Sequence, residues 1–573
     1  MIKQLLIKYR DGVILVLLPL ILTSINSNWI FTPVTNYMPD PWFYFAYFRY
    51  FYNYAPVYPS NVHYFVERLT WNVPGFYLYK IFPPLQANYI LHLSVYYVAV
   101  FSLFGTLNLI FNRRTALMSA LLMGSYPWVL RAVGWDYVDG TGIAHMLLLI
   151  FVLTLAHFTA NWRACFIVAG IVHSSLIVTN LFWLAFFPGW AVYFILINRK
   201  TGKFKLEQLI LVIAYFLVGS LFTISLCGFF YYWVTGNYFF LENSLKSAVF
   251  LTHDVRSIND TAINYGHLRP YWHVLPGIIA FVSTWKLCFS KRDKSTLPFI
   301  AVYFLFVYSY SLLIFWHSYS LPFLIVFPYS SYALPASFLL FGGLLSSFFD
   351  SFSRQQFEVF AVLSGILLIL PFAVLRIFPT MENLQGNVYL VLVFSLALTG
   401  LLLVSKNRSS ILISGLVLIV LFYLVAENAY VFLPNPWQGR DNFMGIVSAS
   451  QILDSYYPNH NYQDFRLWFR SDKNYDTFFS LACLYLYPWG SALGEPFSSR
   501  KPATELTLVE RDILQEGDKI VIVSSDSARA AILEEANRSA ARQHRKLEFE
   551  TSKTIEQGSL KFFLYFTKVS VIN

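Results

Sequence analysis

The stretch GVILVLLPLILTSINSNWI, residues 12–30, decides the fold class because it is long and apolar enough to cross a membrane. Lys3, Lys8 and Arg10 precede it, as in a signal peptide, but it lacks a small-residue cleavage site, so we interpret it as a first spanning helix. The whole chain of 573 residues is 57% hydrophobic and only 13% charged. Soluble proteins carry about 25% charged residues, so lipid must be the solvent for much of this chain.

The same hydropathy rule predicts about thirteen spans, which gives an all-α polytopic membrane domain over residues 1–434. The predicted spans are 12–30, 88–111, 116–132, 140–160, 164–181, 183–198, 207–233, 272–289, 296–316, 321–348, 357–378, 387–404 and 410–431.

Basic residues test this layout, because short cytoplasmic loops are enriched in Lys and Arg. With a cytoplasmic N-terminus, every short basic cluster falls on the inner side: Lys3, Lys8, Arg10, Arg113, Arg114, Arg163, Arg199, Lys200, Lys203, Lys205, Lys291, Arg292, Lys294, Arg354, Lys406 and Arg408. The net charge of +10 therefore reflects cytoplasmic loops and not nucleic-acid binding. An odd number of spans then places the C-terminus outside.

This topology predicts the accessibility of inserted tags. Tags at residues 202 and 407 should be shielded from membrane-impermeant reagents in intact cells, and a tag at residue 573 should be labelled. Labelling of both loop tags with a shielded C-terminus would overturn the layout.

Three segments on the predicted outer side differ from the inner loops. They are residues 31–87, which are aromatic and proline-rich, residues 133–139, and the polar loop 234–271. Within the first, Val62 to Tyr79 is expected to form amphipathic helices that lie on the membrane surface.

The composition changes at residue 435, and the segment 435–573 is expected to form a small, water-soluble, extracytoplasmic α/β domain. Lys519 to Ser524 is typical of a buried strand, and Leu560 to Ile572 of one or two strands. Asp526 to Arg545 is typical of a helix, with Ser525 or Asp526 as its cap.

Asp40 is the first candidate catalytic residue. It lies between two prolines in an aromatic run, a rigid and partly apolar setting in which burial makes a carboxylate a better base. The alternative is a turn aspartate, a role for which Asp is well suited.

Asp136 and Asp139 are three residues apart at the start of the predicted fourth span, which would place both on one helix face. Two converging carboxylates could hold a divalent metal such as Mg or Mn, or share a proton. The alternative is helix capping, because Asp139 would be favourable at the positive end of the helix dipole. Glu67, beside Arg68 in the first outer loop, completes the candidate acids; the two could also pair with each other or with solvent.

Positive side chains gather in the loop 234–271, namely Lys246, Arg256, His267 and Arg269. The planar donor fork of arginine suits phosphate, so these residues are candidates for binding a donor phosphate. The alternative is contact with lipid headgroups, which any basic residue at this depth would make.

These motifs together resemble the GT-C superfamily of integral-membrane glycosyltransferases, which includes protein O-mannosyltransferases, aminoarabinose transferases and oligosaccharyltransferases. The matching segments are Pro39-Asp40-Pro41-Trp42, Pro74 to Lys80, Gly134 to Asp139 and Tyr329 to Pro335, where Ser stands in place of the usual Arg. The resemblance covers residues 1–430 by topology and only short motifs by residue.

The resemblance implies a membrane glycosyltransferase that moves a sugar from a polyprenyl-phosphate donor to an extracytoplasmic glycan, lipid or protein acceptor. Asp40 would be the base, with Asp139 and Glu67 as further candidates, and Arg256 or Arg269 would hold the departing phosphate. The metal is optional, because some relatives need none.

Two other functions fit a polytopic chain. A transporter or lipid flippase should carry ionisable residues in mid-span and a repeat symmetry, and few mid-span charges are present. A polymerase or ligase of surface polysaccharide should place its large outer loop late in the chain.

Overall fold

The computed structural model describes residues 2–34, 40–56, 64–198, 206–246, 297–318, 331–349, 439–458, 465–469, 514–541 and 543–572, with residues 279, 280, 283, 284, 287 and 353. The chain divides into two compact units. The membrane unit comprises Met1–Ile30, Glu67–Trp71 and Ile90–Pro434. The sheet unit comprises Phe31–Val66, Asn72–Tyr89 and Asn435–Asn573, so most of the first predicted outer loop belongs with the C-terminal segment.

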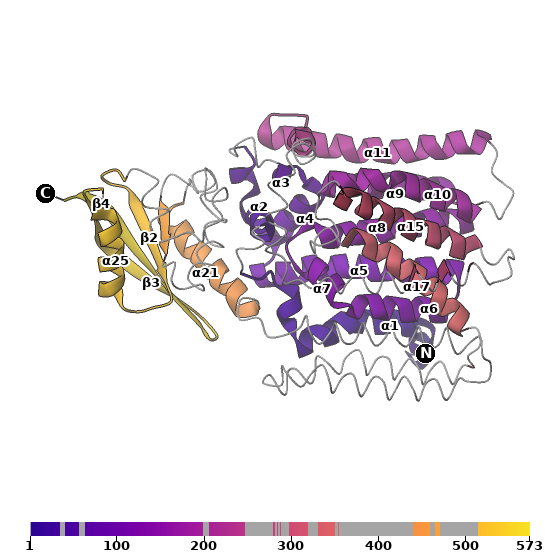
Figure 1. Cartoon of the computed structure of the whole chain (residues 1–573), viewed down its shortest axis with the longest axis horizontal. Coiled ribbons are helices and arrows are strands. Elements are labelled where there is room, and N and C mark those ends of the chain that lie inside the picture. The colour runs from indigo at the N-terminus through magenta and orange to yellow at the C-terminus, as the bar shows by residue number, and fades with distance from the viewer. Residues whose placement is uncertain are drawn as a thin grey trace. The chain divides into compact units, whose positions relative to one another are not determined.

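The membrane unit is a bundle of apolar helices (Figure 1). Its elements are α1 (Ile2–Ile25), η1 (Ser27–Ile30), most of α5 (Pro84–Ile110), α6 (Arg113–Ser125), α7 (Pro127–Gly134), α8 (Val138–Phe158), α9 (Trp162–Thr179), η2 (Leu181–Phe186), α10 (Phe187–Asn198), α11 (Leu206–Thr235), α15 (Leu297–Ser318), η7 (Ser331–Ala333) and α17 (Leu334–Phe349).

Six helices of the described residues are long and apolar enough to cross a membrane, or seven if the bent pair α6 and α7 is one span. The chain is thus a multi-pass, largely helical membrane protein. The predicted number of thirteen is not confirmed, and the predicted spans 357–378, 387–404 and 410–431 lie outside the described residues.

Close helix contacts explain the positions of small residues in these spans. A Cβ added to Gly170 of α9 would lie 2.0 Å from the carbonyl oxygen of Phe216, and one added to Gly219 of α11 would lie 1.9 Å from that of Ile167. Ser220 also donates to the Gly170 carbonyl at 3.3 Å. In lipid there is no hydrophobic driving force between helices, so their association depends on close packing. Small residues allow the helix backbones to approach closely enough for this packing.

A break between α6 and α7 shapes one end of the bundle, and the two helices meet at a bend of 66°. Pro127 begins α7, where its missing N–H costs no hydrogen bond. At the other end of α7, a Cβ on Gly134 would lie 1.8 Å from the carbonyl oxygen of Trp29, so α7 packs directly against η1. The chain then turns through residues 135–137 into α8.

The sheet unit contains a four-stranded sheet in the order β1-β2-β4-β3, in which only β1 and β2 are parallel. Its elements are α2 (Asp40–Tyr54), α3 (Tyr64–Glu67) up to Val66, most of α4 (Leu69–Ile81), α21 (Arg440–Tyr456), β1 (Arg466–Phe469), β2 (Lys519–Ser524), α25 (Arg529–Ala541), β3 (Arg545–Gln557) and β4 (Leu560–Val571).

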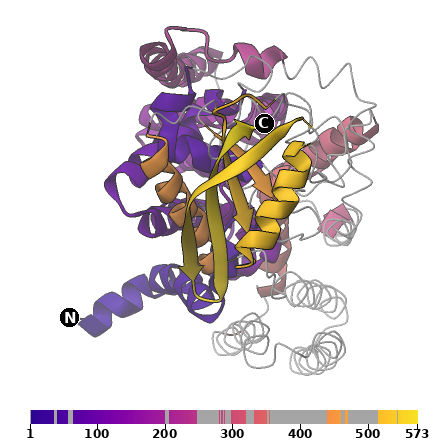
Figure 2. The ribbon, with the colours of Figure 1, turned by 90° about the vertical axis from the view of Figure 1, so that its left-hand side faces the viewer.

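Two helices pack on opposite faces of this sheet (Figure 2). Tyr565 joins the buried cluster formed with Ile532 and Ala536 of α25. Its neighbour Phe566 stacks on Tyr456 at the end of α21, with ring centroids 4.0 Å apart. Successive strand residues point to opposite faces, so β4 separates the two helices.

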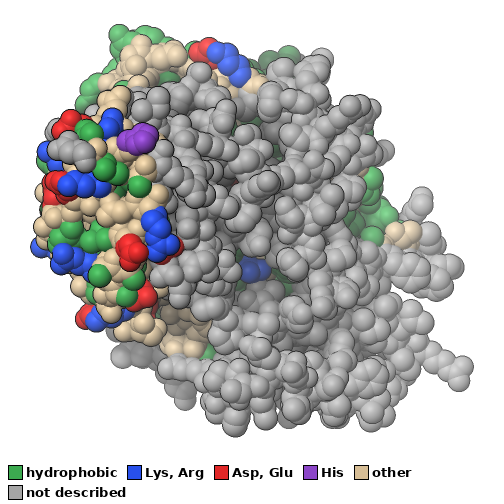
Figure 3. All heavy atoms as spheres, turned by 60° about the vertical axis from the view of Figure 1, so that its left-hand side comes forward, with side chains coloured by type: hydrophobic (Ala, Val, Ile, Leu, Met, Phe, Trp, Pro, Cys, Tyr) green, Lys and Arg blue, Asp and Glu red, His purple; other side chains and the backbone are tan. Residues whose placement is uncertain are grey.

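The predictions for this segment are confirmed for β2 and for a strand beginning at Leu560. The predicted helix is shorter than expected, and Asp526 accepts a hydrogen bond from the backbone N–H of Ala528 at 2.9 Å just before it. The strand β3 was not predicted, because the few apolar residues that it packs into the core, Leu547 and Phe549, are separated by exposed charged and polar residues. Figure 3 shows Lys, Arg, Asp and Glu side chains interspersed among other residues on the described part of one side of the molecule.

Candidate active site

Three buried carboxylates of the membrane unit, Glu67, Asp136 and Asp139, lie near the start of α8 and the end of α9, and we call this the carboxylate end. Asp139 is the second residue of α8, and Asp136 lies in the turn just before that helix. The segment that starts at Glu67 is fastened to the last turn of α9. Thr70 Oγ1 lies 2.9 Å from the carbonyl oxygen of Ser175 and 3.0 Å from Thr179 Oγ1.

Asp136 forms a fully buried pair with His92 of α5. The Nε2 atom of His92 lies 3.1 Å from Oδ1 of Asp136, and His92 Nδ1 lies 2.6 Å from the carbonyl oxygen of Val133. The side chains are 0% and 1% exposed. The sequence analysis missed His92, and its only signal was a polar residue inside an apolar span.

This geometry fixes where protons lie. A carbonyl oxygen can only accept, so Nδ1 of His92 must carry a proton. Nε2 then either donates to an ionised Asp136 or accepts from a protonated one, so one further proton is shared by the pair. Both arrangements have zero net charge, which is what a site without water contact favours.

Asp139 is buried in the first turn of α8, with 2% exposure. Asp136 precedes the N-cap residue Tyr137, so the expectation that both aspartates share one helix face is wrong. A metal at Asp136 and Asp139 would need further ligands. Among the described residues, no group of three or more His, Cys, Asp or Glu side chains is arranged to hold one, so we derive no step through a metal.

Glu67 is also fully buried, and its carboxylate accepts hydrogen bonds from the backbone and the side chains of Asn243 and Ser244. Oε1 accepts from the backbone N–H and the side-chain amide of Asn243, at 2.8 and 2.9 Å, and Oε2 accepts from the backbone N–H of Ser244 at 2.7 Å. Burial raises the pKa of Glu67 above its ordinary value, and these hydrogen bonds oppose the rise. Glu67 thus caps the helical turn 242–246 from a distant part of the chain.

We expect Glu67→Ala to release this turn. The substitution leaves donors of Asn243 and Ser244 without their acceptor, a loss of roughly 1–3 kcal/mol for a buried group. Limited proteolysis in detergent should then cleave near residues 236–246 sooner than in the wild type. Glu242→Ala, which removes an exposed acid of the same turn, is the control. Unchanged cleavage of Glu67→Ala would show that other contacts hold the turn.

Of the predicted phosphate-binding residues, only Lys246 lies within the described residues. Its ammonium lies 2.6 Å from Oε1 of Glu242, one helical turn earlier, and both side chains are exposed. This partner lowers the pKa of Glu242. Arg256, His267 and Arg269 lie outside the described residues.

Asp40 begins α2 in the sheet unit, and it is partly exposed. Trp42 fixes the start of the helix, because its Nε1 donates to the carbonyl oxygen of Pro33 at 3.1 Å. Helices are found within the predicted range 62–79, as α3 and α4, and their position on the membrane surface stays a prediction.

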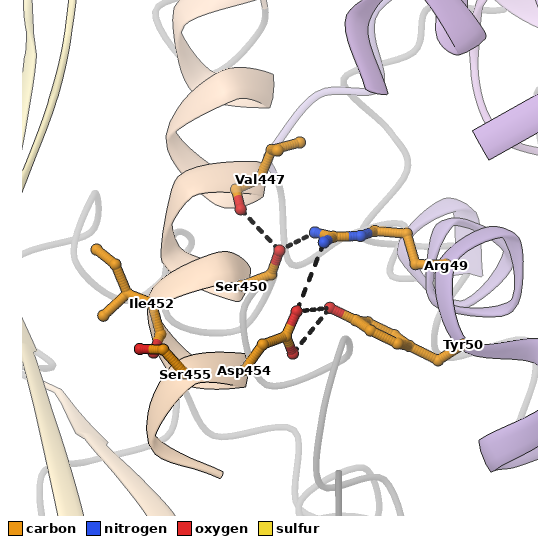
Figure 4. A network of polar contacts seen from close by, with 7 residues as sticks. All are labelled: Arg49, Tyr50, Val447, Ser450, Ile452, Asp454 and Ser455. Carbon is orange, nitrogen blue, oxygen red and sulfur yellow. Dashed lines mark hydrogen bonds and ion pairs between the residues drawn. The ribbon is translucent and has the colours of Figure 1, made fainter. Parts of the chain in front are cut away.

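The far end of α2 is tied to α21 by a polar network that the sequence analysis missed (Figure 4). The hydroxyl of Tyr50 donates to the carboxylate of Asp454, with distances of 2.8 and 3.1 Å to its two oxygens. A guanidinium nitrogen of Arg49 lies 3.6 Å from the same carboxylate, and another donates to Ser450. This network anchors the helix that begins at Asp40.

The predicted late motif 329–335 is described from Ser331 onward. Tyr332 is buried, accepts a hydrogen bond from the side-chain amide of Asn180, and packs edge-on against Trp183, with ring centroids 4.5 Å apart. Trp183 itself lies against Gly142 of α8. The motif therefore packs an aromatic cluster close to the start of α8.

No protein-family model and no curated protein matches the chain. Among solved structures, the chain is similar to ArnT from Cupriavidus metallidurans bound to undecaprenyl phosphate, with 12% identity, 97% of this chain and 98% of that chain covered, and a TM-score of 0.48. It is also similar to the Archaeoglobus fulgidus oligosaccharyltransferase tethered with an acceptor peptide, with 11% identity, 95% and 73% covered, and a TM-score of 0.41. Because both TM-scores are below 0.5, these similarities carry no argument about function, and a functional assignment must rest on the side chains described above.

Proposed function

We propose that the chain is a GT-C-type membrane glycosyltransferase that moves a sugar from a polyprenyl-phosphate donor to an extracytoplasmic glycan, lipid or protein acceptor. The observation that carries the proposal is the carboxylate end, where buried acids and the neutral His92–Asp136 pair lie at one end of an apolar bundle. A donor whose headgroup binds at this end of the bundle would keep its lipid chain among the membrane lipids.

The distribution of charge favours a transferase over a transporter. The Asp, Glu, Lys and Arg residues of the six candidate spans are Asp139 and Arg163, and each is the second residue of its helix. Within α1, the buried Asp11 is paired with Arg113. A transporter that couples ions would be expected to carry such residues near the bilayer midplane. The histidines His145 and His173 lie deeper, among apolar and aromatic neighbours.

In the proposed reaction, the acceptor hydroxyl attacks the anomeric carbon of the sugar and the bond between that carbon and the phosphate oxygen breaks. The hydroxyl proton passes to Asp40, and polyprenyl phosphate leaves. Groups that stabilise the charge on the leaving phosphate contribute most of such catalysis. Arg256 and Arg269 stay our predicted partners of that phosphate, and the extracytoplasmic side of the site follows from the basic loops.

The experiment uses the purified full-length protein in detergent with radiolabelled polyprenyl-phosphate sugars and a panel of acceptors. We expect release of polyprenyl phosphate together with a labelled acceptor. If no lipid-linked sugar is consumed, yet labelled lipid crosses liposome membranes only when the protein is present, the flippase function replaces the transferase.

A further inference from the structure

Arg131 is a cation at the carboxylate end that the proposed reaction has not used. It lies in α7, five residues before Asp136, and it is partly buried. Its guanidinium carbon lies 5.7 Å from the ring centroid of Trp128 and 5.4 Å from that of Trp135. Two indole faces therefore hold one guanidinium group.

This arrangement leaves the donors of Arg131 available. A cation–π contact gives the five N–H donors of the guanidinium no oxygen acceptor, so they can still bind one. Among the described residues, the side chain of Arg131 has no hydrogen bond and no ion pair, although Asp136 and Asp139 are close in sequence. A stacked arginine with unused donors matches an oxyanion that accepts two parallel hydrogen bonds.

One of the three acids at the carboxylate end, Asp136, is compatible with a nearby anion. The His92–Asp136 pair has no net charge in either proton arrangement, so Asp136 does not repel an incoming phosphate as a lone carboxylate would. Arg131 and the His92–Asp136 pair are connected through the backbone of α7, because the Val133 carbonyl that binds His92 lies two residues after Arg131. Tryptophans are also frequent at the depth of lipid headgroups.

We propose that Arg131 binds the phosphate group of the lipid carrier, with Trp128 and Trp135 holding its guanidinium plane in position. The identity of the lipid rests on the proposed function, whereas the anion site rests on the geometry of Arg131 alone. Arg131 would position the phosphate for bond cleavage, and Arg256 and Arg269 are not required for this contact.

The test measures equilibrium binding of radiolabelled undecaprenyl phosphate to the full-length protein in detergent. Arg131→Gln is expected to weaken binding by about ten-fold or more, which is about 1.4 kcal/mol, because the substitution removes a charge-assisted contact. Arg131→Lys should restore part of the affinity, since an ammonium keeps the charge without the fork. Uncharged undecaprenol should bind wild type and Arg131→Gln equally.

Arg163→Gln is the matched control, because Arg163 also stacks on a tryptophan, Trp162, at 5.6 Å but lies at the start of α9, the opposite end from Thr179. It should bind undecaprenyl phosphate like the wild type. Equal affinity of wild type and Arg131→Gln, with both proteins monodisperse, would overturn the proposal. Competition by phosphatidylglycerol as effective as that of unlabelled undecaprenyl phosphate would also overturn it, because the site would then hold any lipid headgroup.

The two proposals fail in different ways. Binding that depends on Arg131 without any sugar transfer by the wild type would reject the transferase and keep the phosphate site. If the wild type transfers sugar but its lipid binding does not depend on Arg131, the phosphate site is rejected and the transferase is kept.

Discussion

Asp40→Asn is expected to abolish sugar transfer while the protein stays folded. An asparagine cannot accept the proton of the acceptor hydroxyl, and a positioned general base contributes about 10²–10⁴-fold to a rate. Asparagine is well tolerated at the start of a helix, so α2 should still begin at this position. Turnover of a labelled polyprenyl-phosphate sugar measures the effect, and thermal melting with size exclusion in detergent measures folding.

Asp526→Asn is the matched control for this substitution. Asp526 also precedes a helix, and an asparagine there keeps the oxygen that accepts from the N–H of Ala528. Its turnover should equal that of the wild type. If Asp40→Asn also turns over at the wild-type rate, Asp40 is only the residue that begins α2, and another group must be the base.

His92→Leu should give the largest loss of stability. The substitution removes the His92 partner of the buried Asp136, and breaking a buried pair of this kind costs about 3–5 kcal/mol. For a domain of a few hundred residues this corresponds to a fall of roughly 10 °C in the melting midpoint. Thermal unfolding in detergent, followed by loss of monodisperse protein, measures it.

Asp136→Asn distinguishes the contribution of the His92–Asp136 pair to stability from the contribution of its shared proton to the reaction. The amide of an asparagine can donate to Nε2 of a neutral His92, whose Nδ1 proton still binds the Val133 carbonyl, so the fold should be kept. The shared proton is lost, and sugar transfer should slow if that proton serves the reaction.

For the His92→Leu variant, a melting midpoint equal to that of the wild type would show that the buried pair does not form.

Much of the membrane unit could be predicted from the sequence, because a span needs only a continuous apolar run. The helices α5, α8, α9 and α11 lie where hydropathy placed them, within a few residues at each end. The strand β2 was predicted for the same reason, since its residues are apolar and almost all buried. These features depend on the local sequence and its solvent, so no distant contact is needed to infer them.

The partners of the polar residues depended on tertiary structure. The sequence places His92 44 residues before Asp136, and Glu67 176 residues before Asn243. Asp454 meets Tyr50 across 404 residues, and this contact assigns α2 and α21 to one unit. A buried polar group must find a hydrogen-bond partner, but sequence alone does not say which one, because that choice depends on which helices pack together. The sequence therefore determined which segments enter the membrane, and the packing of those segments decided that Glu67 is a helix cap, that Asp136 shares a proton with His92, and that Arg131 is held between two tryptophans.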